Sequence, residues 1–355
     1  MKINSELRQH LMIGEVCNRF SYNGLIMQFF NKMKIVLLCF AVSFCYATRI
    51  NAEVGHKVVN VKYDNGSSPS IAFISSGEYA GYIAEAHQAS KLGSCALWFD
   101  IFDPYTEKRV VNVKYEDNAS NPSIAFIPSG KYAGYIAEVH QTGNLWFDIF
   151  DPYTEKRVVN VKYEDNASDP SIAFISSGKY AGCIAEAHHD NANGLWFNIL
   201  DQDGERVVNV KYEDNGSTPS IAFIPSGKYA GYIAEVHEFS EGQDDNLWFD
   251  ILDQDGERVV NIKYEDKGLV PSIAFISSGE YAGYIAEAHQ DQSDSKLWFD
   301  VLGQTGERIV NVEYDKGKLP SIAFISSGEY DSYIAEAHLT SGVTDDLWFD
   351  IVSTK

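Results

Sequence analysis

Apolar positions along the chain alternate with a period of two, and this alternation returns in almost the same form about every 50 residues. In the second copy, "RVVNVKYE" places Val111, Val113 and Tyr115 on one face of an extended segment and polar residues on the other. The short apolar runs are rich in Val, Ile, Tyr, Phe and Trp and are bounded by Gly, Pro, Asn or Asp, which is typical of strands. No part of the repeat region keeps a helical period, so the sequence predicts an all-β protein.

The repeat itself predicts the architecture. The six Trp residues of the chain mark six copies, with spacings of 48, 50, 52, 50 and 50 residues. Each copy reads "RVVNVKYE", a polar turn, "PSIAF", an "SSG" or "PSG" turn, "GYIAEVH", a loop of variable length, and "LWFDI", with small changes between copies. Four strands in each of six copies predict a six-bladed β-propeller of four-stranded antiparallel blades. The alternative is two tandem β-trefoils, because a trefoil unit also has four strands, but no linker separates the third copy from the fourth.

The two ends of the repeat region carry complementary strands. It begins with "KVVNVKY" (57–63) and ends with "LWFDI" (347–351). If "PSIAF" is the inner strand and "VVNVKY" the outer strand, the first strand completes the last blade and closes the ring.

The N-terminal segment differs in character from the repeats. We assign residues 1–52 to an extension with a signal peptide and residues 53–355 to the six-repeat propeller. From Met33, the favoured true start, the chain has Lys34, thirteen mostly apolar residues (35–47) and small residues suited to cleavage. A membrane span needs about twenty apolar residues. We therefore predict a secreted protein without stable membrane insertion; a short membrane anchor is the alternative.

Charge narrows the choice of partners. The net charge is −22, and it is about −26 after residue 52, because the first 52 residues are basic. An acidic surface repels phosphate backbones and anionic lipids, so we expect no nucleic-acid partner. Four copies carry an N-x-[ST] sequence at the same turn, which is either a glycosylation site or simply good turn chemistry; the four residues are Asn65, Asn118, Asn166 and Asn215.

The repeated polar set is a Glu-x-His pair followed by the Trp. Side chains at i and i+2 share a strand face, so each Glu lies beside its His. In one interpretation each copy forms a sugar pocket, with the Trp stacked on the ring and the Glu and His bonded to hydroxyls. In the other, the set is a buried hydrogen-bond ladder with Trp as core. The candidate ligand-binding residues are Glu85, His87, Trp98, Glu138, His140, Trp146, Glu186, His188, Trp196, Glu235, His237, Trp248, Glu287, His289, Trp298, Glu336, His338 and Trp348.

Metal binding and catalysis have weaker support. A zinc site needs three or four ligands, and the only third ligand in view, the Asp of "LWFD", is Asn198 in the third copy. An enzyme needs an asymmetric set of groups in one cleft, whereas every copy offers the same residues. We therefore predict no metal, no cofactor, no catalytic residues and no enzyme activity.

The stretch "AEVHQ" (137–141) followed by "LW" (145–146) resembles a known repeat. Modules of secreted bacterial proteins of the phosphatidylinositol-specific phospholipase C type read approximately P-S-V-A-L, G-x-V-V-E-V-H-Q and L-W-Y, and the similarity spans residues 57–355. The segment before residue 57 is too short for a phospholipase domain, so the resemblance implies the appended adhesive or targeting module. Six-bladed fucose-binding lectins are similar in expected architecture. Their sugar pockets generally include an Arg, and the nearest counterpart, which opens "RVVNV", is Lys57 in the first copy.

These observations predict a secreted, non-enzymatic binding module that is multivalent and lectin-like, with glycans or glycoproteins as partners. The alternative is a structural or protein-interaction scaffold in which the Glu-His-Trp set is purely architectural. Solvent-open Trp side chains would favour the first interpretation and fully buried ones the second.

Overall fold

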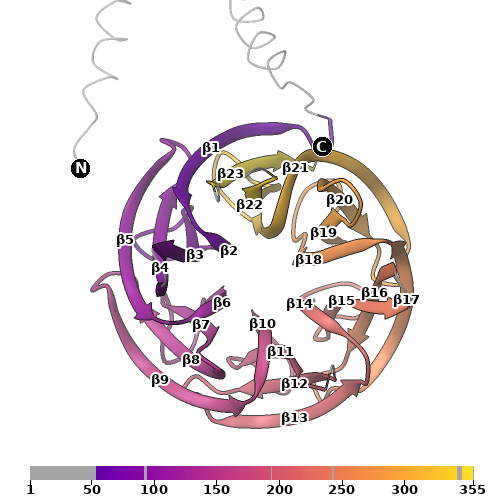
Figure 1. Ribbon diagram of the computed structural model, residues 1–355, viewed down its shortest axis with the longest axis horizontal. Coiled ribbons are helices and arrows are strands. Elements are labelled where there is room, and N and C mark those ends of the chain that lie inside the picture. The colour runs from indigo at the N-terminus through magenta and orange to yellow at the C-terminus, as the bar shows by residue number, and fades with distance from the viewer. Residues whose placement is uncertain (1–52, 92–93, 193, 242–243, 342–345, 355) are drawn as a thin grey trace, which may run out of the picture. The chain divides into compact units, whose positions relative to one another are not determined.

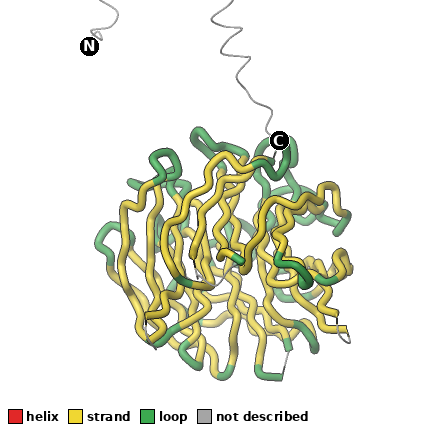
Figure 2. The backbone as a smooth tube through the Cα atoms, turned by 45° about the horizontal axis from the view of Figure 1, so that its top comes forward, coloured by secondary structure: helices red, strands yellow, loops and turns green. Residues whose placement is uncertain are grey.

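The computed structural model describes residues 53–91, 94–192, 194–241, 244–341 and 346–354. All regular elements in these ranges are strands, as Figure 2 shows. The all-β prediction is confirmed. The predicted signal peptide and the start at Met33 lie outside the described residues. Within the described ranges, no helix has the length and apolar character that a membrane crossing requires.

The strands surround a central axis in a propeller arrangement (Figure 1). The outer strands are β1 (Lys57–Asn65), β5 (Lys108–Asp117), β9 (Lys156–Asp165), β13 (Arg206–Glu213), β17 (Arg258–Asp266) and the first part of β21 (Arg308–Ile325). The inner strands are β2 (Ser67–Phe73), β6 (Ser120–Phe126), β10 (Ala167–Phe174), β14 (Ser217–Phe223), β18 (Gly268–Phe275) and the last part of β21.

Two further strands lie between each inner strand and the next outer strand. Those next to the inner strands are β3 (Ile83–Lys91), β7 (Ile136–Gln141), β11 (Ile184–Asp190), β15 (Ile233–Glu241), β19 (Ile285–Asp291) and β22 (Tyr333–Thr340). Those next to the outer strands are β4 (Ser94–Asp103), β8 (Asn144–Asp151), β12 (Leu195–Leu200), β16 (Asp244–Leu252), β20 (Lys296–Leu302) and β23 (Asp346–Ser353).

The sheet count differs from the prediction. The described strands form four separate four-stranded sheets and one seven-stranded sheet of order β1-β23-β22-β21-β20-β19-β18. The reason is β21, which runs without a break from the rim toward the axis, so that residues 308–316 pair with β20 and residues 317–325 pair with β22. The prediction of six separate four-stranded blades is therefore wrong in its count, while the propeller is confirmed. The two tandem β-trefoils are excluded.

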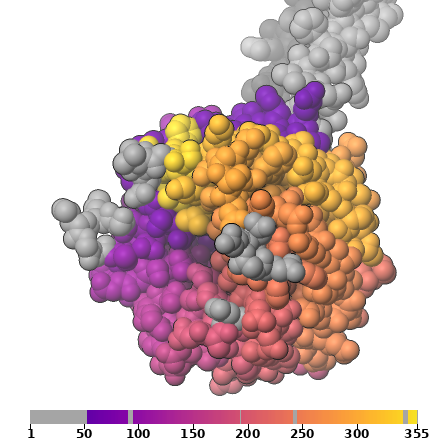
Figure 3. Space-filling view, turned by 45° about the vertical axis from the view of Figure 1, so that its right-hand side comes forward, coloured from indigo at the N-terminus to yellow at the C-terminus, as the bar shows by residue number. Residues whose placement is uncertain are grey.

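The ring is closed by the first strand of the repeat region. Strand β1 pairs antiparallel with β23, from Lys57 opposite Val352 to Asn65 opposite Asp346. Figure 3 shows the indigo and yellow ends of the propeller side by side on the surface. This confirms the predicted closure and removes two free sheet edges, which are open to pairing with other chains.

Neighbouring sheets are joined face to face by apolar layers. One cluster contains Phe99 and Ile101 of β4, Ile124 of β6 and Ile136 of β7, and the same arrangement recurs around the ring. A single blade cannot cover its own faces, which explains why both faces of these strands are apolar.

Around the axis, the inner strands are also linked by a ring of hydrogen bonds. The Ser of each "PSIAF" accepts a hydrogen bond from the backbone N–H of the Ile in the next repeat, at 3.0–3.1 Å. The last bond, from Ile71 to Ser321, joins the first inner strand to the final one. This ring holds the inner strands in a fixed register where they line the axis.

Candidate functional site

The predicted Glu-x-His pairs lie inside the propeller. All six Glu residues are at most 3% exposed and all six His residues at most 2% exposed. In each pair the His Nδ1 lies 2.8–3.1 Å from a carboxylate oxygen of the Glu. These contacts are those of the buried ladder. Ligand binding by the Glu-x-His pairs stays a prediction, and the Trp side chains are half-buried rather than fully enclosed.

The ladder extends from one sheet to the next. The hydroxyl of Tyr115, on outer strand β5, donates to Glu138 on β7 of the following sheet at 3.0 Å. Arg109 binds Asp100 of its own sheet at 2.9 Å and Asp64 of the preceding sheet at 2.5 Å. Equivalent tyrosine and arginine contacts recur around the ring, so much of the repeated polar set joins adjacent sheets.

Electrostatics in the ladder favour a protonated imidazole. Burial alone would lower the pKa of His87, but the charge and hydrogen bond of Glu85 outweigh burial and raise the pKa to about 9. Glu, His and Asp atoms come within 4.8 Å of one another in several repeats, as in Glu85, His87 and Asp100. His87 and Arg109 place positive charge beside these two carboxyl groups, whose pKa values are raised by burial.

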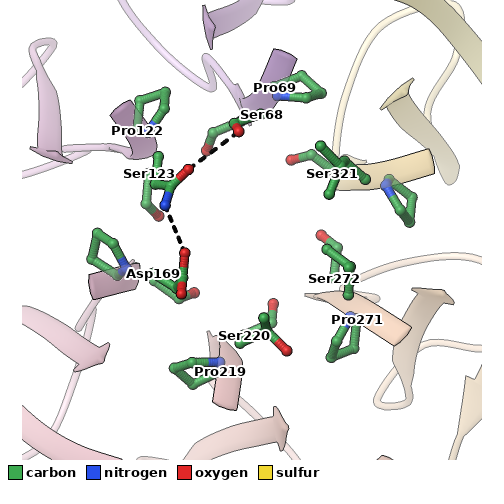
Figure 4. Close-up of a pocket in the computed structure, with 18 residues that line it drawn as sticks. Ser68, Pro69, Pro122, Ser123, Asp169, Pro219, Ser220, Pro271, Ser272 and Ser321 are labelled. Carbon is green, nitrogen blue, oxygen red and sulfur yellow. Dashed lines mark hydrogen bonds between the residues drawn. The ribbon is translucent and has the colours of Figure 1, made fainter. Parts of the chain in front are cut away.

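A different site lies on the propeller axis. A cavity of about 210 Å³ is lined by the three residues x-Pro-Ser that begin "PSIAF" in each repeat (Figure 4). The residue before the Pro is different in every repeat: Ser68, Asn121, Asp169, Thr218, Val270 and Leu319. The Pro and Ser are constant, so the axial pocket has a regular wall that carries six unlike side chains.

The backbone at these six positions is unusual. Each residue before the Pro has a positive φ between 45° and 53°. This left-handed conformation is uncommon for non-glycine residues, and for a β-branched residue such as Val270 it is a real outlier. Strained backbone of this kind is concentrated at functional sites, where the surrounding structure enforces it.

The pocket is polar on one side and apolar on the other. Ser68 donates to Asn121 at 3.3 Å, and Asn121 Nδ2 donates to Asp169 Oδ1 at 2.6 Å, as the dashed lines in Figure 4 show. The other carboxylate oxygen of Asp169 lies 3.3 Å from Nδ1 of His189. Val270 and Leu319 complete the opposite side.

A second carboxylate lies at the rim. Glu238 follows the His of the fourth repeat, is 9% exposed, and accepts a hydrogen bond from the backbone N–H of Val270. Burial raises the pKa of the Glu238 carboxyl, so it holds its proton to higher pH than an ordinary Glu. Asp169 lines the pocket, and Glu238 lies beside it through its bond to the pocket residue Val270, so the two acidic groups have unlike environments.

The sequence contains an indication of this site, namely the positions at which the repeats differ, but attention to the constant residues overlooks it. Outside the loops, the repeats diverge most before the Pro and directly after the His, where Gln88, Gln141, His189, Glu238, Gln290 and Leu339 stand. Antiparallel strand pairing brings these two variable positions close. Ser168 pairs with His189, and Ser217 pairs with Glu238; Ser168 and Ser217 each directly precede a residue that lines the pocket. Positions that vary between otherwise similar repeats therefore indicate this site.

The four predicted glycosylation residues, Asn65, Asn118, Asn166 and Asn215, are exposed at their turns. Glycosylation at these positions stays a prediction.

Comparison with known proteins gives a fold and no family. No family model matches the chain, and no curated protein matches it. A GH93 α-L-arabinofuranosidase of Fusarium graminearum in complex with arabinobiose is 13% identical, with a TM-score of 0.57 over 84% of this chain and 98% of that one. A mutant of an α-L-arabinofuranosidase from the same organism, in complex with an iminosugar inhibitor, is 12% identical with a TM-score of 0.59 over the same shares.

These neighbours correct two predictions, the non-enzymatic binding module and the absence of enzyme activity. Both solved structures are enzymes that act on glycosides, and they share the fold with this chain. The prediction failed because it assumed that six similar repeats offer six similar surfaces. The axial pocket takes its side chains from the positions where the repeats differ.

Proposed function

We propose that the protein is a glycoside hydrolase whose substrate lies in the axial pocket. The observation that carries this proposal is the break in repeat symmetry at the axis, where Asp169 lines the pocket and contacts His189, and where Glu238 contacts the pocket residue Val270. The neighbours on the same fold supply the substrate class, an arabinose-containing glycoside. We treat the seven-stranded sheet as two blades joined through β21, which makes the ring six-fold.

The two carboxyl groups suit the two roles that glycoside hydrolysis requires. One acid protonates the leaving oxygen of the glycosidic bond, and the other carboxylate acts as nucleophile or activates water. The buried Glu238, with its raised pKa, fits the acid. Asp169, which is more exposed and accepts a hydrogen bond from Asn121, fits the second role.

The sides of the pocket suit a sugar. Hydroxyl, amide and carboxylate groups of Ser68, Asn121 and Asp169 can bond to sugar hydroxyls, while Val270 and Leu319 can contact the apolar face of the ring. The strained backbone holds these side chains at the pocket, which gives a fixed arrangement before the substrate arrives.

The test is hydrolysis of 4-nitrophenyl α-L-arabinofuranoside and of linear arabinan oligosaccharides. Glu238→Gln and Asp169→Asn should each lower kcat by about 10²–10⁴-fold, the range for loss of an acid or base. Asp203→Asn, an exposed residue paired with Lys131, is the matched control and should leave kcat unchanged. Turnover that survives both pocket substitutions would contradict the site. A folded protein inactive on a wider panel of glycosides would contradict the function.

A further inference from the structure

We propose that two outer pockets, one in the third repeat and one in the fifth, bind carbohydrate at sites separate from the axial pocket. Their volumes are about 280 Å³ and about 240 Å³. Both are lined by equivalent residues: the Trp of "LW", the His of Glu-x-His, the Arg and Asn of "RVVN" or "RIVN", and three acidic side chains. The proposal does not depend on the axial site being catalytic.

Each pocket has a half-buried Trp as its aromatic wall, and in the third repeat the orientation of the indole is fixed. Trp196 lines the pocket of the third repeat and is half-buried. Its Nε1 donates to Asp190 at 2.9 Å, and Asp190 also accepts backbone N–H bonds from Ala192 and Gly194. The hydrogen bond at Nε1 therefore fixes the orientation of the indole ring. A rigid indole face that borders a pocket suits the apolar face of a sugar ring.

The polar groups offer both donors and acceptors. Arg308 binds Glu265 and Asp300, and both contacts use the same nitrogen, Nη1. Among the described residues, the remaining N–H groups of this guanidinium meet no protein acceptor, so they can donate to ligand hydroxyls. The carboxylate oxygens of Glu265 and Asp291 accept hydrogen bonds in the same pocket. A polyhydroxylated ligand uses both kinds of partner.

Other ligand classes fit less well. In the pocket of the third repeat, three acidic side chains outnumber the single Arg and oppose an anion such as phosphate, whereas the pocket of the fifth repeat also contains Lys267. A metal ion would need the buried Glu, His and Asp set, but the third repeat has Asn198 in place of the Asp and still forms its pocket. The two pockets share the Trp, the Arg and the acidic side chains. A neutral sugar can stack on the Trp, accept hydrogen bonds from the Arg and donate hydrogen bonds to the carboxylates.

The position of these pockets suggests their use. They involve the outer strands β9 and β13 in one case and β17 and β21 in the other, whereas the axial pocket is lined by the inner strands. Two weak sites on one rigid ring can hold a polymeric glycan at high effective concentration. Such sites would keep a polysaccharide near the axial pocket.

The experiment measures binding of the purified protein to a glycan array and to insoluble arabinan, xylan and cellulose. It uses the Asp169→Asn/Glu238→Gln background, so that hydrolysis cannot remove the probe. In that background, Trp196→Ala/Trp298→Ala should weaken binding by about tenfold or more, which equals roughly 1.4 kcal/mol. Val207→Ala/Ile309→Ala is the matched control, because these exposed residues adjoin Arg206 and Arg308 on the opposite strand face.

The outcomes separate the possibilities. Loss of binding in the Trp variant with retention in the control supports the proposal, and each variant is first shown to keep the parent melting temperature. If the Trp variant does not fold, Arg206→Lys/Arg308→Lys keeps the charge but removes the planar fork, and the same loss is expected. Unchanged binding in the variants, no binding by the folded parent to any probe, or loss of binding with a chelator alone would each overturn the proposal.

Discussion

Replacement of Tyr115 by Phe tests whether the buried ladder joins the sheets. The Tyr115 hydroxyl donates to Glu138 in the next sheet at 3.0 Å, and its ring packs against Phe150 at a centroid distance of 6.2 Å. The substitution keeps the ring and removes only the hydroxyl. It therefore isolates one inter-sheet hydrogen bond from the packing around it.

The expected loss follows from the charge and burial of the acceptor. Glu138 is 3% exposed and is left with the contact from His140 at 2.9 Å. Loss of a hydrogen bond to a buried charged group costs about 1.5–3 kcal/mol. With an m-value of about 3 kcal/mol per M urea, a loss of about 2 kcal/mol lowers the unfolding midpoint by roughly 0.7 M.

The assay is urea unfolding followed by tryptophan fluorescence, with Tyr163→Phe as the matched control. Tyr163 holds the equivalent position in the next repeat, and its buried hydroxyl lies beside Glu186 without a hydrogen bond of normal geometry. Removal of this poorly bonded hydroxyl should cost clearly less than removal of the Tyr115 hydroxyl. Equal losses in the two variants, or no loss in Tyr115→Phe, would refute the conclusion that the ladder stabilises the ring.

Three further predictions concern charge, strain and closure. The folded-state pKa of His87 is raised to about 9 from 6.5, so its contribution to stability is full below about pH 6.5 and is lost as pH rises through 9. The unfolding free energy should fall by about 1–3 kcal/mol over that range, and less in His87→Gln. Val270→Gly should relieve the positive φ of 48° and raise the unfolding free energy by about 1 kcal/mol while lowering activity, measured by urea unfolding and by hydrolysis. Lys57→Met removes the ion pair with Asp350 at 2.9 Å and leaves that carboxylate buried, so it should cost about 3 kcal/mol and promote aggregation, seen by light scattering.

Much of the fold could be predicted from the repeat. Alternating apolar residues gave the strands, and the offset between "KVVNVKY" and "LWFDI" gave the closure between β1 and β23. The continuity of β21 could not be foreseen, because "YDKGK" (314–318) reads as a turn in the way that "YEDNG" does in the fourth repeat. Whether such a segment breaks a strand depends on backbone angles that tertiary contacts select.

The site was harder to predict, because pattern recognition draws attention to what is constant. The Glu-x-His pairs stand out in the sequence, and the structure buries them between apolar layers. The residue before the Pro, in contrast, belongs to no recognisable sequence motif. Only the folded ring shows that Asp169 and Asn121, 48 residues apart, are hydrogen-bonded neighbours at the axis.

A closed ring of repeats separates stability from function by position. The contacts between sheets must be made in every repeat, so Glu, His, Tyr and Arg are repeated there, and a change in one copy leaves a buried charge without its partner. The residues before the Pro line a shared pocket, where their side chains differ from copy to copy, although some also bond to a neighbouring repeat, as Asn121 does to Asp169. The repeated Glu, His, Tyr and Arg set does not include these positions, so the pocket can be polar on one side and apolar on the other. The proposed catalytic groups, Asp169 and Glu238, accordingly lie where the repeats differ.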